Sequence, residues 1–302
     1  MERKQKNVLE GLVGGNVRFD CPMAPYTTLG VGGPAEAIYE ARDPAALRRV
    51  IAYLYEEHIA YLVVGNGSNL LIKDEGLEGV VILLRDSLAG LEEEAGDEFT
   101  ILAGAGLTIV ELLNYCRRQG LGGVEFLAGI PGTVGGAVKM NAGAFGKEIE
   151  ARIHGIRVID SRGDVVLKDR AELKFSYRNL EMEKGSVIIG GRFRLDRETA
   201  NTVAARIAEC LKIRKQNQPL EYPSAGSVFK NPPGDYAARL IEKTGLKGKR
   251  VGGAMISEKH ANFIVNTGGA TAKDILALLH LAQERVTKET GIRLQPEIRV
   301  IG

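Results

Sequence analysis

Hydrophobic and polar residues follow two different spacings along the chain, and these spacings predict short strands mixed with helices. Apolar side chains recur at helical spacing after Asp43-Pro44, at Leu47, Val50, Ile51 and Leu54. Asp43 supplies an N-cap for this helix, and Pro44 fits its first turn. Short apolar runs at 61–64 and 79–84 predict buried strands. With an N-terminal helix and loop over 1–20 and a strand at 35–41, these elements predict a small α+β lobe.

The same patterns predict a second, strand-rich lobe with one clear helix. Thr108 and Glu111 form a capping box that begins this helix, and Gly120 ends it. A Ser-Arg-Gly turn joins two of the predicted strands as a hairpin. The strands predicted in this lobe are 99–103, 153–160, 164–168 and 186–195.

The C-terminal part begins with a long predicted helix, 196–216, which the proline-containing segment 219–223 breaks. We place a domain boundary at this break. Beyond it the pattern predicts a loop, a helix closed by Gly245, two strands, a helix ending at Gly291 and a last strand. In chain order these elements are 224–234, 235–244, 251–256, 261–265, 271–290 and a strand that contains 296–299.

Composition places the chain among globular proteins and points to no charged macromolecular partner. Of its 302 residues, 44% are hydrophobic and 26% charged, from which we expect two or three domains and a large core. The 40 basic residues nearly equal the 38 acidic ones, and a net charge of +2 gives no general argument for binding nucleic acid or membrane. A local basic pocket for phosphates is compatible with this balance.

Cysteines, histidines and the N-terminus argue against several further classes of protein. The cysteines are far apart in sequence and form no C-x-x-C, which favours free thiols in a reducing compartment; they are Cys21, Cys116 and Cys210. The four histidines form no metal-binding spacing, so we expect no metal. The N-terminus is basic without an apolar run, and no segment approaches the roughly 20 apolar residues of a membrane span. We therefore expect a cytoplasmic protein.

Two glycine-rich segments are the strongest functional signal in the sequence. Segment 127–146 holds six glycines and one charged residue, Lys139, and segment 61–73 carries Gly65-Asn66-Gly67-Ser68-Asn69 between apolar runs. Glycine at this density suits turns with positive φ, and clustered backbone N–H groups bind anions. Either segment alone is better explained as a tight turn in a β-rich protein. Together they indicate a ligand with phosphates and a flat ring.

The usual nucleotide-binding signatures are absent from the sequence. No G-x-G-x-x-G joins a strand to a helix, and no G-x-x-x-x-G-K-[ST] is present. Gly65-x-Gly67 is only a fragment of such motifs. We therefore do not expect a doubly wound nucleotide fold.

Three local groups offer further chemistry, and each also has a simpler explanation. Arg178, next to Tyr177, suits two-point recognition of a carboxylate, although an isolated arginine is more often solvated. Ser227, with Lys230 three residues later, presents a hydroxyl in a small-residue turn, but no G-x-S-x-G elbow is present. Glu297 and Arg299 fall on one face of a predicted strand, where they could contact a ligand. The same pattern equally suits ordinary charges on an exposed edge strand.

Seven ordered motifs resemble those of one known family, the UDP-N-acetylenolpyruvoylglucosamine reductases, which are flavoenzymes of peptidoglycan synthesis. The resemblance runs from about Tyr26 to the C-terminus and rests on YTTLGVGG, VVGNGSNLL, AGIPGTVGGAVKMNAGAFG, FSYRN, AGSVFKNP, GGAMISEKHANFIVN and PEIRVIG. The chain lacks the longer insertion that some members carry after FSYRN, so it resembles the shorter subtype.

The resemblance implies an α+β fold with an FAD-binding region of the PCMH/VAO type in two lobes, 1–90 and 91–204, and a C-terminal substrate-binding domain, 205–302. It also implies non-covalent FAD, because neither glycine-rich segment carries a His or Cys. Both glycine loops are implied to lay backbone N–H groups on the FAD pyrophosphate or to let backbone approach the flavin. The implied cofactor-binding residues are Val64, Gly65, Asn66, Gly67, Ser68, Asn69, Gly129, Pro131, Gly132, Thr133, Gly135, Gly136, Asn141 and Gly143.

The resemblance implies an NADPH-dependent, FAD-mediated reduction of UDP-N-acetylglucosamine enolpyruvate to UDP-N-acetylmuramate, a step that serves cell-wall synthesis, cell shape, the cell cycle and cell division. Arg178 is implied to pair with the substrate carboxylate, Glu297 to position and polarise it, and Ser227 to supply a proton. His260 is equally well explained as a packed or surface residue. Candidates for holding the UDP-sugar are Tyr177, Arg214, Gln218, Lys230, Asn231, His260 and Arg299.

Two alternatives stay open at this point. The chain could be another FAD-dependent oxidoreductase of the same wider fold, or a non-catalytic nucleotide-binding module. A yellow protein would exclude the module, and reoxidation by the enolpyruvyl sugar nucleotide but not by oxygen alone would exclude an oxidase. The expected partners are the UDP-sugar and NADPH, with no nucleic acid, no membrane and no metal, and we expect a monomer.

Overall fold

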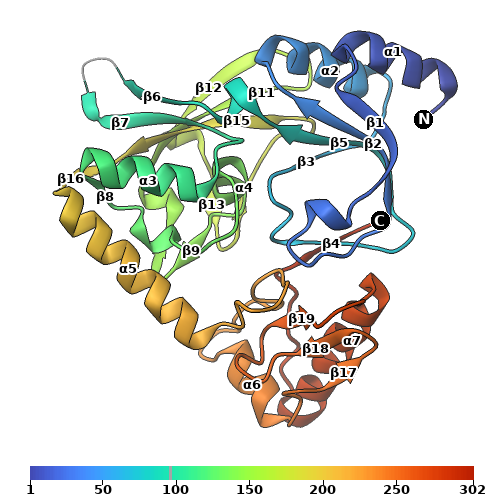
Figure 1. Cartoon of the computed structure of the whole chain (residues 1–302), viewed down its shortest axis with the longest axis vertical. Helices are drawn as coiled ribbons and strands as arrows, with labels where there is room; N and C mark the ends of the chain where they lie inside the picture. The colour runs from blue at the N-terminus through green and yellow to red at the C-terminus, as the bar shows by residue number, and fades with distance from the viewer. Residues whose placement is uncertain (95–96) are drawn as a thin grey trace. The chain divides into compact units, whose positions relative to one another are not determined.

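The computed structural model of the chain describes residues 1–94 and 97–302, and these divide into two compact units (Figure 1). The first unit comprises 1–19, 37–65 and 79–212, and the second comprises 20–36, 66–78 and 213–302. Both units thus draw on the N-terminal part of the chain. The division into 1–90, 91–204 and 205–302 stays a prediction.

A four-stranded sheet, which belongs mainly to the first unit, has the strand order β1-β2-β5-β3. Its strands are β1 (Val17–Pro22), β2 (Pro34–Ala41), β5 (Leu77–Leu84) and β3 (Tyr61–Val64). Every residue of β5 from Gly79 to Leu84 is buried, as expected of a strand that is covered on both faces. Three of the four strands match predicted ones, while β1 was predicted as loop.

Helix α2 (Pro44–Glu56) forms as the pattern of apolar residues predicts. The Asp43 carboxylate accepts a hydrogen bond from the Ala46 N–H at 2.8 Å, and Pro44 occupies the first turn. All four apolar positions of its inner face are fully buried. Helix α1 (Arg3–Val13) packs beside α2 and ends at Gly14, whose φ of 57° is left-handed.

The first unit also holds an antiparallel five-stranded sheet with the order β12-β11-β15-β7-β6. Its strands are β12 (Val165–Asp169), β11 (Ile153–Ile159), β15 (Val187–Arg194), β7 (Asp97–Gly104) and β6 (Leu91–Glu94). The predicted hairpin is confirmed, with Ile159 opposite Val165. Helix α3 (Ile109–Gln119) begins with the predicted capping box and ends at Gly120.

A short helix, α4 (Val134–Lys139), lies inside the second glycine-rich segment and was not predicted. It packs against β15. A Cβ on Gly135 would lie 2.8 Å from the Cβ of Ala105, so the glycine permits this close packing. Two small hairpins complete this region: β9 (Gly143–Ala144) with β10 (Lys147–Glu148), and β13 (Phe175–Ser176) with β14 (Asn179–Leu180).

The long helix α5 (Ala200–Asn217) begins later than predicted. Asp196 and Arg197 instead form β16 (Asp196–Arg197), which pairs with β8 (Leu121–Gly122). The Thr199 hydroxyl oxygen accepts a hydrogen bond from the Thr202 N–H at 3.1 Å and so caps the helix. The two compact units divide within α5, between Lys212 and Ile213, ahead of the predicted break at 219–223.

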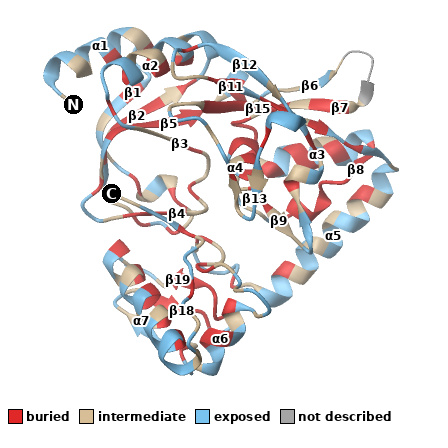
Figure 2. Ribbon diagram, turned by 180° about the vertical axis from the view of Figure 1, so that it is seen from behind, coloured by how far each residue is buried: buried red, intermediate tan, exposed pale blue. Residues whose placement is uncertain are grey.

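The second unit contains helices α6 (Ala237–Lys243) and α7 (Ala272–Thr290) with a three-stranded antiparallel sheet. That sheet consists of β17 (Arg250–Val251), β18 (Ala254–Ile256) and β19 (Ile264–Asn266). The buried residues of α7 recur along one face (Figure 2). The Asp74 carboxylate accepts hydrogen bonds from the Ala272 and Lys273 N–H groups at 2.8 and 2.9 Å and so adds a second cap to α7.

The last strand, β20 (Arg299–Ile301), pairs in parallel with β4 (Leu70–Ile72). Glu297 precedes this strand, so the prediction that Glu297 and Arg299 share one strand face is wrong. The single-turn 3-10 helices of the chain are η1 (Ala24–Tyr26), η2 (Asp86–Ala89), η3 (Glu125–Leu127), η4 (Ile149–Ala151) and η5 (Arg170–Glu172).

Candidate active site

The predicted site residues are distributed over both compact units. The first unit holds Arg178, Tyr177, Val64 and Gly65, together with all the candidates between Gly129 and Gly143. The second unit holds Asn66, Gly67, Ser68, Asn69, Arg214, Gln218, Ser227, Lys230, Asn231, His260, Glu297 and Arg299. Each unit therefore brings together its own subset of the predicted residues.

The loop after β3 has the form of an anion-binding turn. Gly67 has a φ of 59°, and a Cβ there would lie 2.2 Å from the Tyr26 carbonyl oxygen, so only glycine fits. Among the described residues, none accepts a hydrogen bond from the backbone N–H groups of Asn66, Gly67 or Ser68. Three successive backbone donors without a protein acceptor are what a pyrophosphate group requires. This loop therefore fits the phosphate part of FAD.

Gly65, at the end of β3, meets the second glycine-rich segment within the first unit. A Cβ on Gly65 would lie 2.4 Å from the Thr133 hydroxyl oxygen, so the absent side chain permits this approach. The same hydroxyl faces the Gly136 N–H at 3.5 Å, at the start of α4. The two glycine-rich segments predicted from the sequence are thus neighbours at this point.

Backbone donors of the second segment are largely used inside the protein. The Gly132 N–H donates to the Ile130 carbonyl at 3.0 Å, and the Gly135 N–H donates to the Ala105 carbonyl at 2.9 Å. Gly129, with a φ of 81°, has no acceptor for its N–H within the described part of the chain. The first segment is therefore better prepared for an anion than the second, whose role with FAD stays a prediction.

Arg178 lies at the tip of the hairpin β13–β14 with a left-handed φ of 57°. Positive φ is uncommon for a residue other than glycine, and such strain gathers at functional sites. The guanidinium lies 4.8 Å from the Tyr177 ring centroid, and its Nη2 donates to the Gly143 carbonyl at 3.3 Å. Because Gly143 belongs to the second glycine-rich segment, the structure brings Arg178 to that segment.

Ser227 and Glu297 lie on backbone segments that the second unit holds side by side. The Glu297 N–H donates to the Val228 carbonyl at 2.8 Å, and the Lys230 N–H donates to the Gln295 carbonyl at 2.9 Å. These bonds place the Ser227 turn beside Glu297, although the two residues are far apart in sequence.

Asn69 adds the first glycine-rich segment to this group. Its side-chain amide donates to the Glu297 carbonyl at 3.2 Å, and its own carbonyl accepts from the Arg299 N–H at 3.0 Å. Asn69, a candidate cofactor residue, Glu297, a candidate catalytic residue, and Arg299, a candidate substrate residue, thus meet within one unit.

Asn262 supports the Ser227 turn and was not predicted as a site residue. It is 3% exposed, its Oδ1 accepts from the Phe229 N–H at 2.9 Å, and its Nδ2 donates to the Phe229 carbonyl at 2.8 Å. Its carbonyl also accepts from the Val228 N–H at 2.9 Å. The Asn262 side chain thus satisfies the N–H and the carbonyl of Phe229, as a neighbouring strand would, and so supports the backbone between Ser227 and Lys230. Its sequence signal was its place in the GGAMISEKHANFIVN motif.

The end of α5 in the second unit carries or adjoins three of the candidates for holding a UDP-sugar: Arg214, Gln218 and His260. Arg214 Nη1 donates to Gln218 Oε1 at 3.4 Å, and Lys259 Nζ donates to the Lys215 carbonyl at 2.6 Å, which ties the loop before His260 to α5. The Asn231 carboxamide, by contrast, accepts from the Ala237 N–H at 3.0 Å and caps α6. Its side chain therefore has a structural partner already.

His260 is largely enclosed, with its ring edge-on to Phe263 at 4.8 Å between centroids. Its Nδ1 is buried and finds no hydrogen-bond partner in the described part of the chain. Burial lowers the pKa of His260 below its ordinary value. The imidazole is therefore neutral near pH 7.

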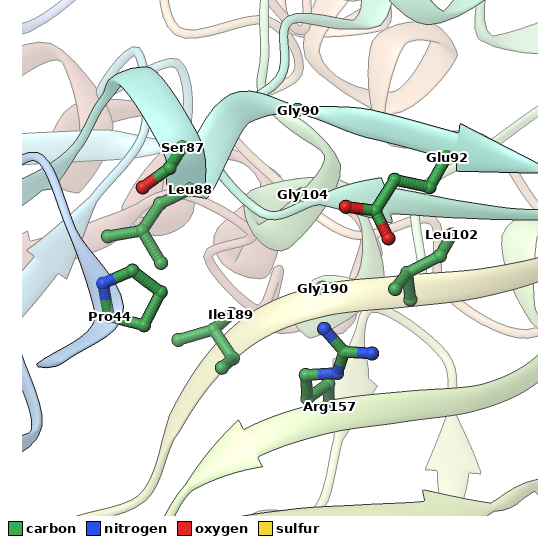
Figure 3. Close-up of a pocket in the computed structure, with 10 residues that line it drawn as sticks. All are labelled: Pro44, Ser87, Leu88, Gly90, Glu92, Leu102, Gly104, Arg157, Ile189 and Gly190. Atoms are coloured by element: carbon green, nitrogen blue, oxygen red, sulfur yellow. The ribbon is translucent and has the colours of Figure 1, made fainter.

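The first unit also contains a pocket between β6, β7, β11 and β15 (Figure 3). Glu92 from β6 and Arg157 from β11 face it from opposite sides, and Leu88 and Ile189 form part of its apolar lining. None of its lining residues is a predicted site residue, so this pocket is separate from the candidate site.

Residues 1–94 and 97–302 contain neither a metal-binding cluster nor a helix suited to span a membrane. In that part of the chain, no three histidine, cysteine or carboxylate side chains gather closely enough to hold a metal ion. The helices described there include none with the length and apolar character needed to cross a membrane.

Two family models match the chain. Residues 35–167 match the FAD binding domain, and residues 218–301 match the C-terminal domain of UDP-N-acetylenolpyruvoylglucosamine reductase. The first match covers both glycine-rich segments. The second covers Ser227, Glu297 and the loop with His260.

Curated and solved proteins are similar over nearly the whole chain. The UDP-N-acetylenolpyruvoylglucosamine reductase of Geobacter metallireducens is 46% identical over 291 residues, which are 95% of each chain. That of Syntrophus aciditrophicus is 41% identical over 98% of this chain and 96% of its own. The crystal structure of the reductase from Thermus caldophilus has a TM-score of 0.79 at 40% identity, covering 95% of this chain and 98% of that one.

Proposed function

The chain belongs to the family of UDP-N-acetylenolpyruvoylglucosamine reductases, and on that basis we propose which of its residues carry out the reaction. The near full-length similarity to curated and solved reductases is the observation that carries the assignment. The protein is an FAD-dependent oxidoreductase that reduces UDP-N-acetylglucosamine enolpyruvate to UDP-N-acetylmuramate with NADPH, in peptidoglycan precursor synthesis. Its fold is the predicted one, an α+β FAD-binding region of the PCMH/VAO type with a C-terminal substrate domain.

Bound FAD supplies the hydride carrier that connects NADPH with the enolpyruvyl group. The N–H groups of Asn66, Gly67 and Ser68 hold its pyrophosphate, because they have no acceptor in the described protein. Gly65 and Thr133 shape the adjoining surface through their close approach. The other glycine-rich residues let backbone come near the ring system.

Arg178 pairs with the substrate carboxylate. Reduction of the enolpyruvyl double bond leaves negative charge on the carbon next to that carboxylate, and stabilising this charge is the main electrostatic task of the site. A guanidinium offers two parallel donors that match a carboxylate. The Tyr177 ring and the Gly143 carbonyl hold the guanidinium in place.

Ser227 supplies the proton to that carbon. A hydroxyl is a weak acid, but the charged carbon is a strong base, so a donor held in place is sufficient. Asn262 and the segment around Glu297 fix the backbone that carries Ser227. The positive charge of Lys230 stabilises the alkoxide that Ser227 becomes when it gives up its proton. Glu297 positions and polarises the carboxylate.

Arg214, Gln218, His260, Lys230 and Arg299 hold the UDP-sugar, with Tyr177 and Asn231 as further candidates. The observation that supports His260 is its buried, unpartnered Nδ1. The Asn231 Oδ1 atom accepts a hydrogen bond from α6, so we expect mainly the amide nitrogen of this side chain to bind the sugar nucleotide. We also propose that the protein is a cytoplasmic monomer with domains 1–90, 91–204 and 205–302.

Rapid mixing tests this function. The purified protein should be yellow, and acid or heat should release free FAD. NADPH should bleach the flavin absorbance, and the enolpyruvyl sugar nucleotide should restore it much faster than oxygen does. Reoxidation by oxygen alone at the same rate would instead indicate an oxidase. A monomeric mass by light scattering would support the proposed oligomeric state.

A further inference from the structure

Three alternate residues of the second glycine-rich segment bind the hairpin that carries Arg178. Lys139, Asn141 and Gly143 each make a hydrogen bond to that hairpin, β13–β14 (Phe175–Ser176 and Asn179–Leu180). We call these three the clamp residues. All the groups involved lie in the first compact unit.

Asn141 makes the central contact of the clamp. It is 0% exposed, and its Nδ2 donates both to the Ser176 carbonyl at 3.2 Å and to Glu148 Oε2 at 3.0 Å. Its Oδ1 accepts from the Glu150 N–H at 3.2 Å. Both donors and the acceptor of the carboxamide are thus used, and all of its partners belong to the protein. The side chain therefore acts on the protein's own geometry.

The outer clamp residues hold the hairpin on either side of that contact. Lys139 Nζ donates to Asn179 Oδ1 at 3.2 Å and to the Leu180 carbonyl. The Gly143 carbonyl accepts from Arg178 Nη2 at 3.3 Å, and a Cβ on Gly143 would lie 3.1 Å from Arg178 Nη1. The second glycine-rich segment thus fixes the backbone on both sides of Arg178 as well as its guanidinium.

The clamp holds two residues in unfavourable backbone conformations. Asn141 has a φ of 40° and Arg178 one of 57°. A left-handed conformation is uncommon at residues other than glycine and persists where surrounding contacts over-determine it. The hydrogen bonds of the clamp are such contacts, because they fix the backbone at and around both residues.

We propose that Lys139 and Asn141 are positioning residues that aim the Arg178 guanidinium at the substrate carboxylate. This inference rests on the proposed role of Arg178. A displacement of about 1 Å at a reacting group can cost about 100-fold in rate. Loosening the clamp therefore slows the transfer of hydride to the enolpyruvyl substrate by a larger factor than it slows the reduction of FAD by NADPH.

A double-mutant cycle with Arg178 tests the proposal. Asn141→Asp keeps the size of the side chain and the acceptor for Glu150, and removes the donor to Ser176. In the otherwise unchanged enzyme it should slow reoxidation of reduced flavin by the enolpyruvyl substrate by about 100-fold. In an Arg178→Lys background the same change should cost no more than roughly twofold, because Asn141 acts through Arg178. Asn201→Asp, at an exposed position in the first turn of α5, is the control for added charge.

Equal losses from Asn141→Asp in both backgrounds would overturn the proposal, since they would indicate a general structural effect. Should Asn141→Asp lose FAD, the Asn141→Asp, Glu148→Gln double variant restores the loop, because the new amide can donate to the new carboxylate. The bond to Ser176 stays broken in it, so slow reoxidation is still expected, and normal reoxidation would contradict the clamp. Normal reoxidation in Arg178→Lys alone would refute the role of Arg178 itself. The two failures are therefore distinguishable.

Discussion

At the scale of single residues, Arg178 combines an uncommon backbone conformation with a guanidinium that two neighbouring residues contact. Its φ of 57° is uncommon for a residue other than glycine, and its contacts to Tyr177 and Gly143 orient the guanidinium. The sequence motif identifies this residue but does not predict its left-handed conformation, because the residue at position 178 is neither glycine nor asparagine.

The first prediction concerns Arg178→Lys. A lysine offers one point charge where the guanidinium offers two parallel donors. We expect the rate of flavin reoxidation by the enolpyruvyl substrate to fall strongly, while the rate of flavin reduction by NADPH changes little. Stopped-flow absorbance measures both half-reactions. Equal losses in both would point to a role in folding or general binding.

The second prediction concerns Ser227→Ala. The variant should bind FAD and accept hydride from NADPH as the unchanged protein does, because Asn262 holds the turn through backbone groups. Its reoxidation should slow by the roughly 10²–10⁴-fold typical of a positioned proton donor. Ser227→Cys should retain part of the rate, since a thiol also donates. Near-normal turnover of Ser227→Ala would transfer the role to Glu297 or water.

The third prediction concerns pH and His260. Because burial lowers the pKa of His260 in the folded protein, the unfolded chain takes up a proton on this residue at a higher pH than the folded chain does. The free energy of unfolding should therefore be unaffected by His260 above the ordinary value of 6.5, and should decline as pH falls below it.

His260→Gln should remove that part of the decline. Urea unfolding at several pH values measures the effect, with the protein free of substrate. An unchanged dependence on pH in the variant would show that His260 titrates in the folded protein as it does in the unfolded chain.

At the scale of elements, the first glycine-rich loop is set by sterics at Gly67. A Cβ there would lie 2.2 Å from the Tyr26 carbonyl oxygen, whereas a Cβ on Gly136 would meet only the Thr133 hydroxyl oxygen at 3.6 Å. Gly136 also lacks a positive φ, since it belongs to α4. The two glycines thus differ in what a side chain would disturb.

The fourth prediction uses this difference. Gly67→Val should empty the FAD site, because the side chain is excluded both by φ and by the Tyr26 backbone. Gly136→Ala should fold and keep the hairpins around it. The flavin content of the purified variants measures the outcome. Full flavin in Gly67→Val would remove this loop from the phosphate site.

Elements with clear periodicity or caps were predictable from the sequence. Helices α3 and α7 lie within a residue or two of both predicted ends, and α2 begins at its predicted N-cap, because Asp43, Thr108 and Gly291 act locally. Helix α4 was missed because its glycines have low helix propensity, and its stability comes from packing on β15. Strand β1 was missed although its residues alternate in burial.

The candidate site was predictable as a set of motifs but not as contacts. The hydrogen bonds between Asn262 and Phe229 join residues that are 33 positions apart in sequence. The hydrogen bond from Asn69 to Glu297 joins residues that are 228 positions apart. Such pairs depend on the tertiary fold. The clamp residues were visible only as part of a glycine-rich run.

At the scale of the whole molecule, the second compact unit depends on early parts of the chain. Its hydrophobic core includes Leu29, Val31 and Leu71 beside residues of α6 and α7. Strand β20 takes its parallel partner from β4, and α7 takes its second cap from Asp74. The C-terminal residues alone therefore lack part of their own core.

The fifth prediction follows from this arrangement. A fragment of residues 213–302 should not fold cooperatively by itself, because it lacks the β4 pairing and three core side chains. Circular dichroism during thermal unfolding would show a broad, weak transition. A sharp transition in the fragment would mean that 213–302 carries a sufficient core.

This interleaving bears on how the protein is made. Residues 20–36 and 66–78 leave the ribosome well before residues 213–302, which supply their partners in the second unit. Leu29, Val31 and Leu71 are therefore left exposed on the nascent chain for most of its synthesis. During this interval they are the natural contacts for a chaperone, and an interrupted chain would keep them exposed as a signal for degradation.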